Sequence, residues 1–155
     1  MAEERRVLAA VEDMMTATTI AAAAARGGAE EGATEIILLH VLSQHPTIRS
    51  LLHMPEHSSA LPGDGEMVLE LAERAVYAQY AAMGKPAPTI AFELVAGEPA
   101  AEIARVANEK DVVLLILGAR RPGAFGLQHP DVRGGLGSQV HCPVRVAPLQ
   151  AEPSH

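Results

Sequence analysis

A regular alternation of short apolar runs with longer helix-like segments constrains the fold of this chain more than any other feature of its sequence. Each run is too short for a helix and predicts a strand. The predicted strands are residues 7–11, 36–41, 89–96, 112–117 and 144–147. Strands joined by helical crossovers pair in parallel, so the pattern predicts an α/β fold, a single open parallel five-stranded sheet with helices on both faces. The run at 112–117 is the most apolar and is the best candidate for a central strand.

The segments between these runs predict helices with recognisable ends. They are residues 16–26, residues 66–83, a helix that begins near Pro99, and a short helix at 134–140 that its glycines weaken. Gly27 and Gly28 are expected to stop the first helix, and Gly84 to close the second. Pro99 suits the first turn of a helix because its missing N–H has no partner there in any case. The methionines of this part of the pattern are expected to fill gaps in the core; they are Met14, Met15, Met67 and Met83.

Length and composition indicate one acidic domain with few aromatic residues. The chain has 155 residues, 3% of them aromatic, no Trp and a net charge of −7. An acidic chain with few aromatic faces is a poor partner for nucleic acid or anionic membranes. The one cysteine, Cys142, excludes an internal disulfide, and no segment has the pattern of a signal peptide or a membrane span, so a cytoplasmic location is expected. The domain is predicted to cover residues 1–149, with a flexible tail at 150–155.

Several short motifs, in this order and spacing, resemble the universal stress protein family. The segments that carry the resemblance are residues 6–11, 37–41, 97–99, 111–120 and 141–146. Among them are Gly-Glu-Pro before a helix, an apolar strand that ends in Gly118, and Cys142-Pro143-Val144 before the last strand. The resemblance implies an adenine-nucleotide α-hydrolase-like fold with strand order 3-2-1-4-5, and commonly a homodimer.

Family members that bind ATP carry the motif Gly-x-x-Gly-x9-Gly-Ser/Thr after the fourth strand, and this chain departs from it. Glycines allow backbone N–H groups to approach phosphates at a helix start. The motif begins here at Gly118, but Arg121, Asp131 and Val132 occupy its next positions. An aspartate at that helix start would repel a phosphate. Residues 134–138 could imitate the missing Gly-Ser, but only residues 139–141 would then remain for the following helix.

The resemblance also implies positions for the adenosine part of a nucleotide. Glu12 stands where the family has an aspartate at the end of the first strand, and Val41 stands at the adenine-side position at the end of the second strand. Arg120 and Arg121 could clamp phosphate or be solvated loop residues, and Gly118 could also be a plain turn. The candidate nucleotide-binding residues are therefore Val11, Glu12, Val41, Leu117, Gly118, Ala119, Arg120 and Arg121. ATP or AMP is the ligand that these positions allow, and none of these residues is assigned a catalytic role.

Other site hypotheses have less support in the sequence. Glu12 and Asp13 together are reminiscent of the acidic pair of response-regulator receivers, but the aspartate and lysine that such domains also need are missing, so a helix cap with a solvated neighbour is the simpler interpretation. His45, His53 and His57 share a loop, where Pro55 disrupts the helix that a metal pair would need, and no metal site is predicted. His141 and Cys142 lack a third orienting group for nucleophilic catalysis.

The leading functional hypothesis is a universal-stress-type regulatory or interaction protein with weakened or lost ATP binding. The alternative is an adenine-nucleotide-binding stress module that uses Glu12, Val41 and the Gly118 loop. No constellation of residues argues for an enzyme. The predicted partner is a second copy, paired through Val144, Arg145 and Val146, because an unpaired edge strand invites pairing. The opposing hypothesis is a monomer whose flanking prolines protect that edge.

Overall fold

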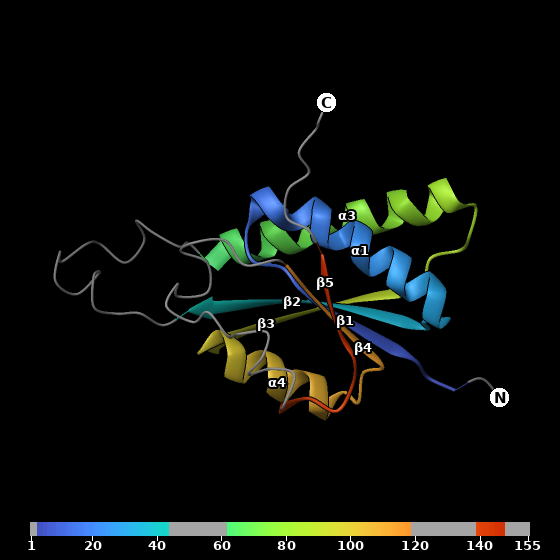
Figure 1. The fold of residues 1–155 in the computed structure, drawn as a ribbon. Coiled ribbons are helices and arrows are strands. Elements are labelled where there is room, and N and C mark those ends of the chain that lie inside the picture. The colour runs from blue at the N-terminus through green and yellow to red at the C-terminus, as the bar shows by residue number, and fades with distance from the viewer. Residues whose placement is uncertain (1–2, 44–61, 119–138, 148–155) are drawn as a thin grey trace, which may run out of the picture.

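The computed structural model describes residues 3–43, 62–118 and 139–147. These residues form three layers, with α1 and α3 on one face of a five-stranded sheet and α4 on the other (Figure 1). The elements in chain order are β1 Arg6–Ala10, α1 Met14–Glu31, β2 Glu35–Ser43, α3 Pro62–Met83, β3 Thr89–Gly97, α4 Pro99–Glu109, β4 Leu114–Gly118 and β5 Val144–Ala147. The predicted α/β class, with helices on both faces of a parallel sheet, is confirmed.

The sheet is parallel throughout and has the order β3-β2-β1-β4-β5. The order implied by the family resemblance is therefore confirmed, and β3 and β5 are the two edges. The middle strand is β1, while β4, which carries the most apolar run, lies between β1 and β5. All five strands run in one direction, so their carboxyl ends gather at one edge of the sheet.

Alternate side chains of the inner strands feed two separate cores. On β1, Val7 and Ala9 pack with α1 and α3, while Leu8 and Ala10 pack with α4. Val7, Leu8 and Ala9 have no exposed surface, as expected of a strand that is covered on both faces. Successive residues of such a strand therefore alternate between the side of the sheet covered by α1 and α3 and the side covered by α4.

Gly27 and Gly28 do not end the first helix, contrary to the prediction. Both lie inside α1, which continues to a left-handed cap at Gly32 with φ of 67°. A Cβ on Gly27 would lie 2.7 Å from Leu114 Cδ2, and one on Gly28 would lie 2.6 Å from the Tyr80 hydroxyl. These glycines serve close packing of α1 on the sheet and on α3, a tertiary role that outweighs their low helix propensity.

Local capping signals agree better with the structure. Asp13 is the N-cap of α1, and its carboxylate accepts a hydrogen bond from the backbone N–H of Thr16 at 2.9 Å. Glu98 caps α4 ahead of Pro99, and Gly84 adopts φ of 70° where α3 ends. The interpretation of Glu12 and Asp13 as a cap and its neighbour is thus confirmed for Asp13.

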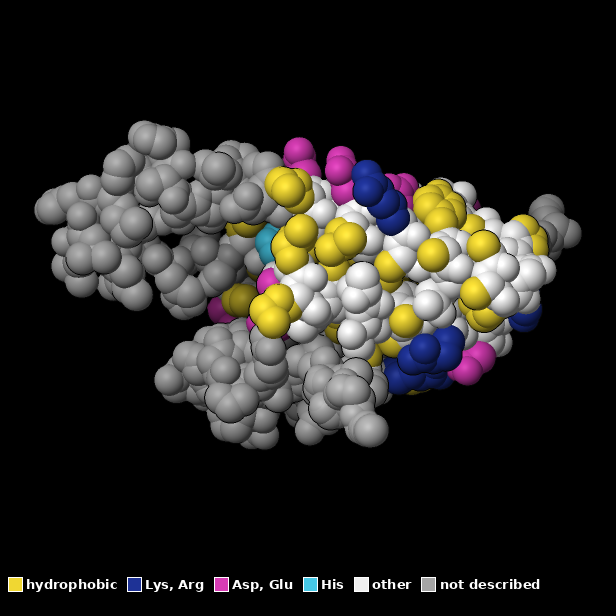
Figure 2. All heavy atoms as spheres, turned by 90° about the horizontal axis from the view of Figure 1, so that it is seen from above, with side chains coloured by type: hydrophobic (Ala, Val, Ile, Leu, Met, Phe, Trp, Pro, Cys, Tyr) yellow, Lys and Arg dark blue, Asp and Glu magenta, His cyan; other side chains and the backbone are white. Residues whose placement is uncertain are grey.

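Three of the four methionines are not core residues, so that prediction is wrong. Met14, Met15 and Met67 are 46%, 78% and 54% exposed, while Met83 packs against the core beneath α3. The exposed three lie at the N-terminal ends of α1 and α3, next to the carboxyl edge of the sheet. Figure 2 looks onto this helix-covered face, where hydrophobic side chains are visible beside the grey residues.

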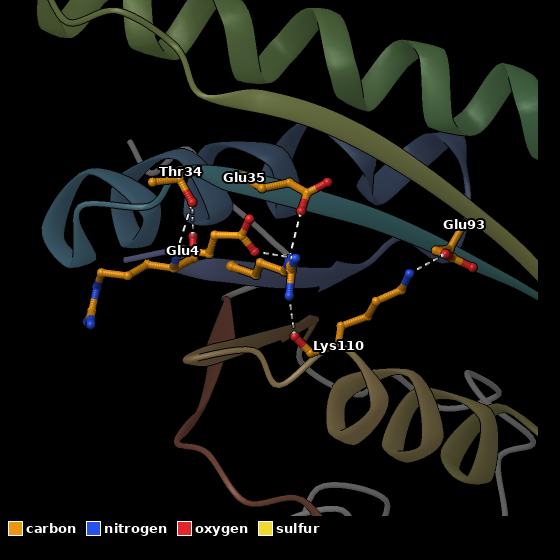
Figure 3. A network of polar contacts seen from close by, with 7 residues as sticks. Glu4, Thr34, Glu35, Glu93 and Lys110 are labelled. Carbon is orange, nitrogen blue, oxygen red and sulfur yellow. Dashed lines mark hydrogen bonds and ion pairs between the residues drawn. The ribbon is translucent and has the colours of Figure 1, made fainter. Parts of the chain in front are cut away.

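The opposite, amino edge of the sheet is held by ion pairs between neighbouring strands and helices (Figure 3). Arg6 of β1 donates to Glu35 of β2 at 2.9 Å and to the carbonyl oxygen of Lys110 at 3.1 Å. The Lys110 ammonium in turn lies 3.4 Å from a carboxylate oxygen of Glu93 on β3. Each of these charges has a partner, and together they tie β1, β2, β3 and the end of α4 to one another.

None of the helices in the described parts of the chain is long and apolar enough to cross a bilayer.

Candidate functional site

The carboxyl edge of the sheet brings the ends of β1, β2 and β4 together. The register pairs Ala10 with Leu39 and Ala9 with Ile116, so the residues after β1 lie between the ends of β2 and β4. Val11 extends this pairing because its N–H donates to the Leu39 carbonyl oxygen at 2.8 Å. Ligands of open α/β sheets bind at this edge, where loops and helix N-termini converge.

The predicted site residues reach this edge from different faces of the sheet. Val11 is buried in the core beneath α1 and α3, whereas Val41 and Leu117 pack in the core beneath α4. Glu12 is half-buried and lines a cavity on the α1 and α3 side. Gly118 ends β4 opposite Ala147. Ala119, Arg120 and Arg121 lie outside the described residues.

The cavity that Glu12 lines has a volume of about 430 Å³ and is bounded by the start of α1, the end of β2 and the start of α3. This volume lies within the range of about 300–1,000 Å³ typical of small-molecule sites. The walls are mainly the apolar side chains of Met14, Leu42 and Met67, and the polar groups are the carboxylates of Glu12 and Asp13 and the imidazole of His40.

His40 is the residue of this cavity that sequence reasoning missed. Its Nδ1 lies 2.8 Å from the Val11 carbonyl oxygen. A carbonyl oxygen only accepts hydrogen bonds, so Nδ1 carries the proton and, in the neutral ring, Nε2 is an acceptor. A signal was present in the sequence, because His40 is the one polar residue inside the apolar run 36–41. Alternation along the strand puts His40 and Val41 on opposite faces of the sheet, but the sequence does not show which of the two faces borders a cavity.

The His141 and Cys142 pair does not form a nucleophilic site in the structure. Burial raises the pKa of the Cys142 thiol above its usual 9.0, which disfavours the reactive thiolate. His141 is exposed, and its backbone N–H donates to the Asn108 side-chain oxygen at 3.3 Å. This arrangement anchors the chain before β5 to α4 and offers no activated sulfur.

Within residues 3–43, 62–118 and 139–147, no three His, Cys, Asp or Glu side chains cluster closely enough to hold a metal ion. The histidines of the metal hypothesis, His45, His53 and His57, lie outside this part of the chain.

An open parallel sheet of this order, with helices on both faces, matches the adenine-nucleotide α-hydrolase-like class of α/β proteins. The profile of the Universal stress protein family matches residues 4–148. The chain therefore belongs to the universal stress protein family. No curated protein matches it by sequence comparison.

Solved structures agree with this assignment at the level of the fold. The chain is similar to a universal stress protein from Archaeoglobus fulgidus, with a TM-score of 0.65, 17% identity, and coverage of 94% of this chain and 99% of that chain. A universal stress protein in complex with cAMP gives a TM-score of 0.61 at 14% identity, covering 96% and 100% of the two chains. An Arabidopsis thaliana family protein with AMP bound gives a TM-score of 0.52 at 18% identity, covering 95% and 93%.

Proposed function

We propose that this chain is a universal-stress-type regulatory protein that holds the adenosine part of a small adenine nucleotide at the carboxyl edge of its sheet, with ATP binding weakened or lost. The observation that carries the proposal is the cavity beside Glu12, because the aspartate at this position meets adenosine in family members that bind ATP. Two structural neighbours were solved with cAMP or AMP, ligands that carry a single phosphate. The proposal includes no catalysed reaction.

The weak affinity for ATP follows from the sequence after β4. Arg121, Asp131 and Val132 stand where ATP-binding relatives have two glycines and a Ser or Thr. Bulky side chains keep the backbone N–H groups away from phosphate, and the Asp131 carboxylate repels it. A monophosphate depends less on this segment than a triphosphate does.

Calorimetric titration with AMP and with magnesium-ATP tests the proposal. We expect AMP to bind and magnesium-ATP to bind with a dissociation constant above about 10 μM, equivalent to about −7 kcal/mol. The matched variant restores the motif with Arg121→Gly, Asp131→Gly and Val132→Ser, and it should tighten ATP binding more than AMP binding. Tight ATP binding by the unmodified chain, or no binding of either nucleotide, would refute the proposal.

We also propose that the chain forms a homodimer through Val144, Arg145 and Val146 of the edge strand β5. The charge that would protect this edge is engaged elsewhere, because the Arg145 guanidinium lies 2.9 Å from a Glu30 carboxylate oxygen on α1. The Pro143 carbonyl oxygen accepts from the Leu115 N–H at 3.0 Å and so points toward β4. By the alternation of a strand, the backbone groups of Val144 and Val146 then point away from β4, toward a partner strand.

A further inference from the structure

His40 is held in one orientation at the wall of the cavity. Its Nδ1–H donates to the Val11 carbonyl oxygen at 2.8 Å, and the other side of the ring faces Gly65 on α3. A Cβ placed on Gly65 would lie 3.0 Å from His40 Cδ2 and 3.7 Å from Nε2. The absence of a side chain at Gly65 therefore makes room for the half-buried His40 ring beside α3, and both residues line the cavity.

With this tautomer the imidazole of His40 offers the cavity a hydrogen-bond acceptor at Nε2. Glu12 and Asp13 contribute carboxylate oxygens, and His40 contributes Nε2. No described residue donates a hydrogen bond to His40 Nε2. A ligand atom that meets His40 Nε2 must therefore be an N–H or O–H donor, because a second acceptor placed there would lie unpaired against the first.

The apolar walls favour a flat aromatic body. Met14 and Met67 flank the cavity at the starts of α1 and α3, and about half of each side chain is exposed. Thioethers pack well against aromatic rings, so these two side chains suit the faces of a planar heterocycle whose edge meets His40.

We infer that His40 is a specificity-determining residue, which selects a 6-aminopurine over a 6-oxopurine by accepting a hydrogen bond from the amino group at Nε2. The inference rests on the proposed function, since it concerns the base of the same nucleotide. An adenine presents an N–H donor at position 6, while a 6-oxopurine presents an oxygen that repels the Nε2 lone pair. Val41, the adenine-side position implied by the family, has its side chain on the opposite face, in the core beneath α4.

The test compares AMP with inosine monophosphate, which carries oxygen in place of the amino group at position 6. We expect the full chain to bind AMP with a dissociation constant about tenfold lower than that for inosine monophosphate. This ratio is the effect of the one hydrogen bond that the amino group of AMP donates to His40 Nε2 and that inosine monophosphate cannot make. His40→Leu should bring the two affinities to within about twofold of each other. The matched control is His141→Leu, an exposed histidine outside the cavity, which should leave the preference unchanged.

Nitrogen NMR of the imidazole tests the same inference without a variant. His40 should show the Nδ1-protonated tautomer in the free protein, and AMP should shift its Nε2 signal while inosine monophosphate leaves it in place. Equal affinity for the two nucleotides, a preference that survives His40→Leu, or an Nε2-protonated ring would overturn the inference and leave the proposed function standing. If neither nucleotide binds, the proposed function itself fails.

Discussion

At the scale of a single residue, Asp13 has two roles, because it caps the start of α1 and also lines the cavity. One of its carboxylate oxygens accepts hydrogen bonds from both the N–H and the hydroxyl of Thr16, each at 2.9 Å. Thr16 is only 3% exposed, and its hydroxyl has the Asp13 backbone carbonyl oxygen, at 3.5 Å, as a second and longer acceptor. The same carboxylate lines the cavity, which means that capping fixes one wall of the site.

Asp13→Ala is therefore expected to lower the free energy of unfolding by about 1–2 kcal/mol, because it removes an N-cap and leaves the buried Thr16 hydroxyl with only its long hydrogen bond to the carbonyl oxygen of residue 13. Urea unfolding followed by circular dichroism measures the change. Asp13→Asn keeps a side-chain oxygen at this position and should lose less than half as much. Equal losses for the two variants would mean that charge, and not the cap, is what matters.

The raised pKa values of two side chains predict how the free energy of unfolding changes at alkaline pH. Burial raises the pKa of the Cys142 thiol above its usual 9.0 and that of the Tyr80 phenol above its usual 10.0. In this range the unfolded chain loses these protons before the folded chain does, so these two groups leave the free energy of unfolding unchanged below about pH 9 and lower it as the pH rises further.

Urea unfolding at several values between about pH 8 and about pH 11 measures this slope. Tyr80→Phe should make it shallower above pH 10, because the phenol no longer ionises. Tyr77→Phe is the matched control for loss of a phenol, since Tyr77 is 46% exposed on the same helix. A slope that Tyr80→Phe does not change would show that the Tyr80 phenol titrates alike in both states.

Single residues were predictable from the sequence where their role is local. The cap at Asp13 and the start of α4 at Pro99 follow from residue types and their immediate neighbours. His40 could not be assigned to the cavity in this way. Its role depends on which face of the sheet it occupies, on the Val11 carbonyl oxygen 29 positions earlier, and on the space left at Gly65.

At the scale of elements, α1 packs closely on the sheet at Gly27, where it has no side chain. Gly27 lies against Leu114 and Ile116 of β4, and Arg145 of β5 passes beside it. Leu114 is 3% exposed and Ile116 is fully buried, so neither can move aside easily.

Gly27→Ala is expected to destabilise the protein by about 1 kcal/mol, although alanine is the better helix former. Overpacking costs about 1–3 kcal/mol, and the gain in helix propensity returns at most about 1 kcal/mol of it. Thermal unfolding measures the outcome, with Thr18→Ala on the exposed side of α1 as the control that should have little effect. A rise in melting temperature for Gly27→Ala would show that α1 can shift away from β4 at no cost.

The elements themselves were largely predictable because their burial patterns are periodic. All five strands lie within a few residues of their predicted ranges, since two-sided burial leaves continuous apolar runs. The errors concern ends and exposure. Gly27 and Gly28 carry the signal of a helix end but serve packing, and Met14 and Met67 are apolar but border a cavity, which a one-dimensional pattern does not encode.

At the scale of the whole molecule, the edge strand β5 has backbone hydrogen-bonding groups that do not face its neighbour β4. β5 is four residues long, and its backbone groups at Val144 and Val146 point away from β4. Two such edges related by a twofold axis can pair with one another in an isologous dimer.

Val146→Pro should convert the predicted dimer into a monomer, because it removes an outward N–H and leaves the bonds between β4 and β5 in place. Light scattering at high micromolar concentration measures the mass. Arg145→Ala is the matched control, which breaks the ion pair with Glu30 without altering the backbone and should remain dimeric. A monomeric unmodified chain would refute the dimer, and a dimer that tolerates Val146→Pro would place the interface elsewhere, for example on α3.

The ion pairs around Arg6 and Lys110 have a consequence for how such a protein can change over evolutionary time. They hold the sheet together at the edge opposite the cavity, so substitutions there alter robustness without touching ligand preference. A lineage can therefore change its ligand at the cavity while the two buried cores and this distant set of charges keep the fold.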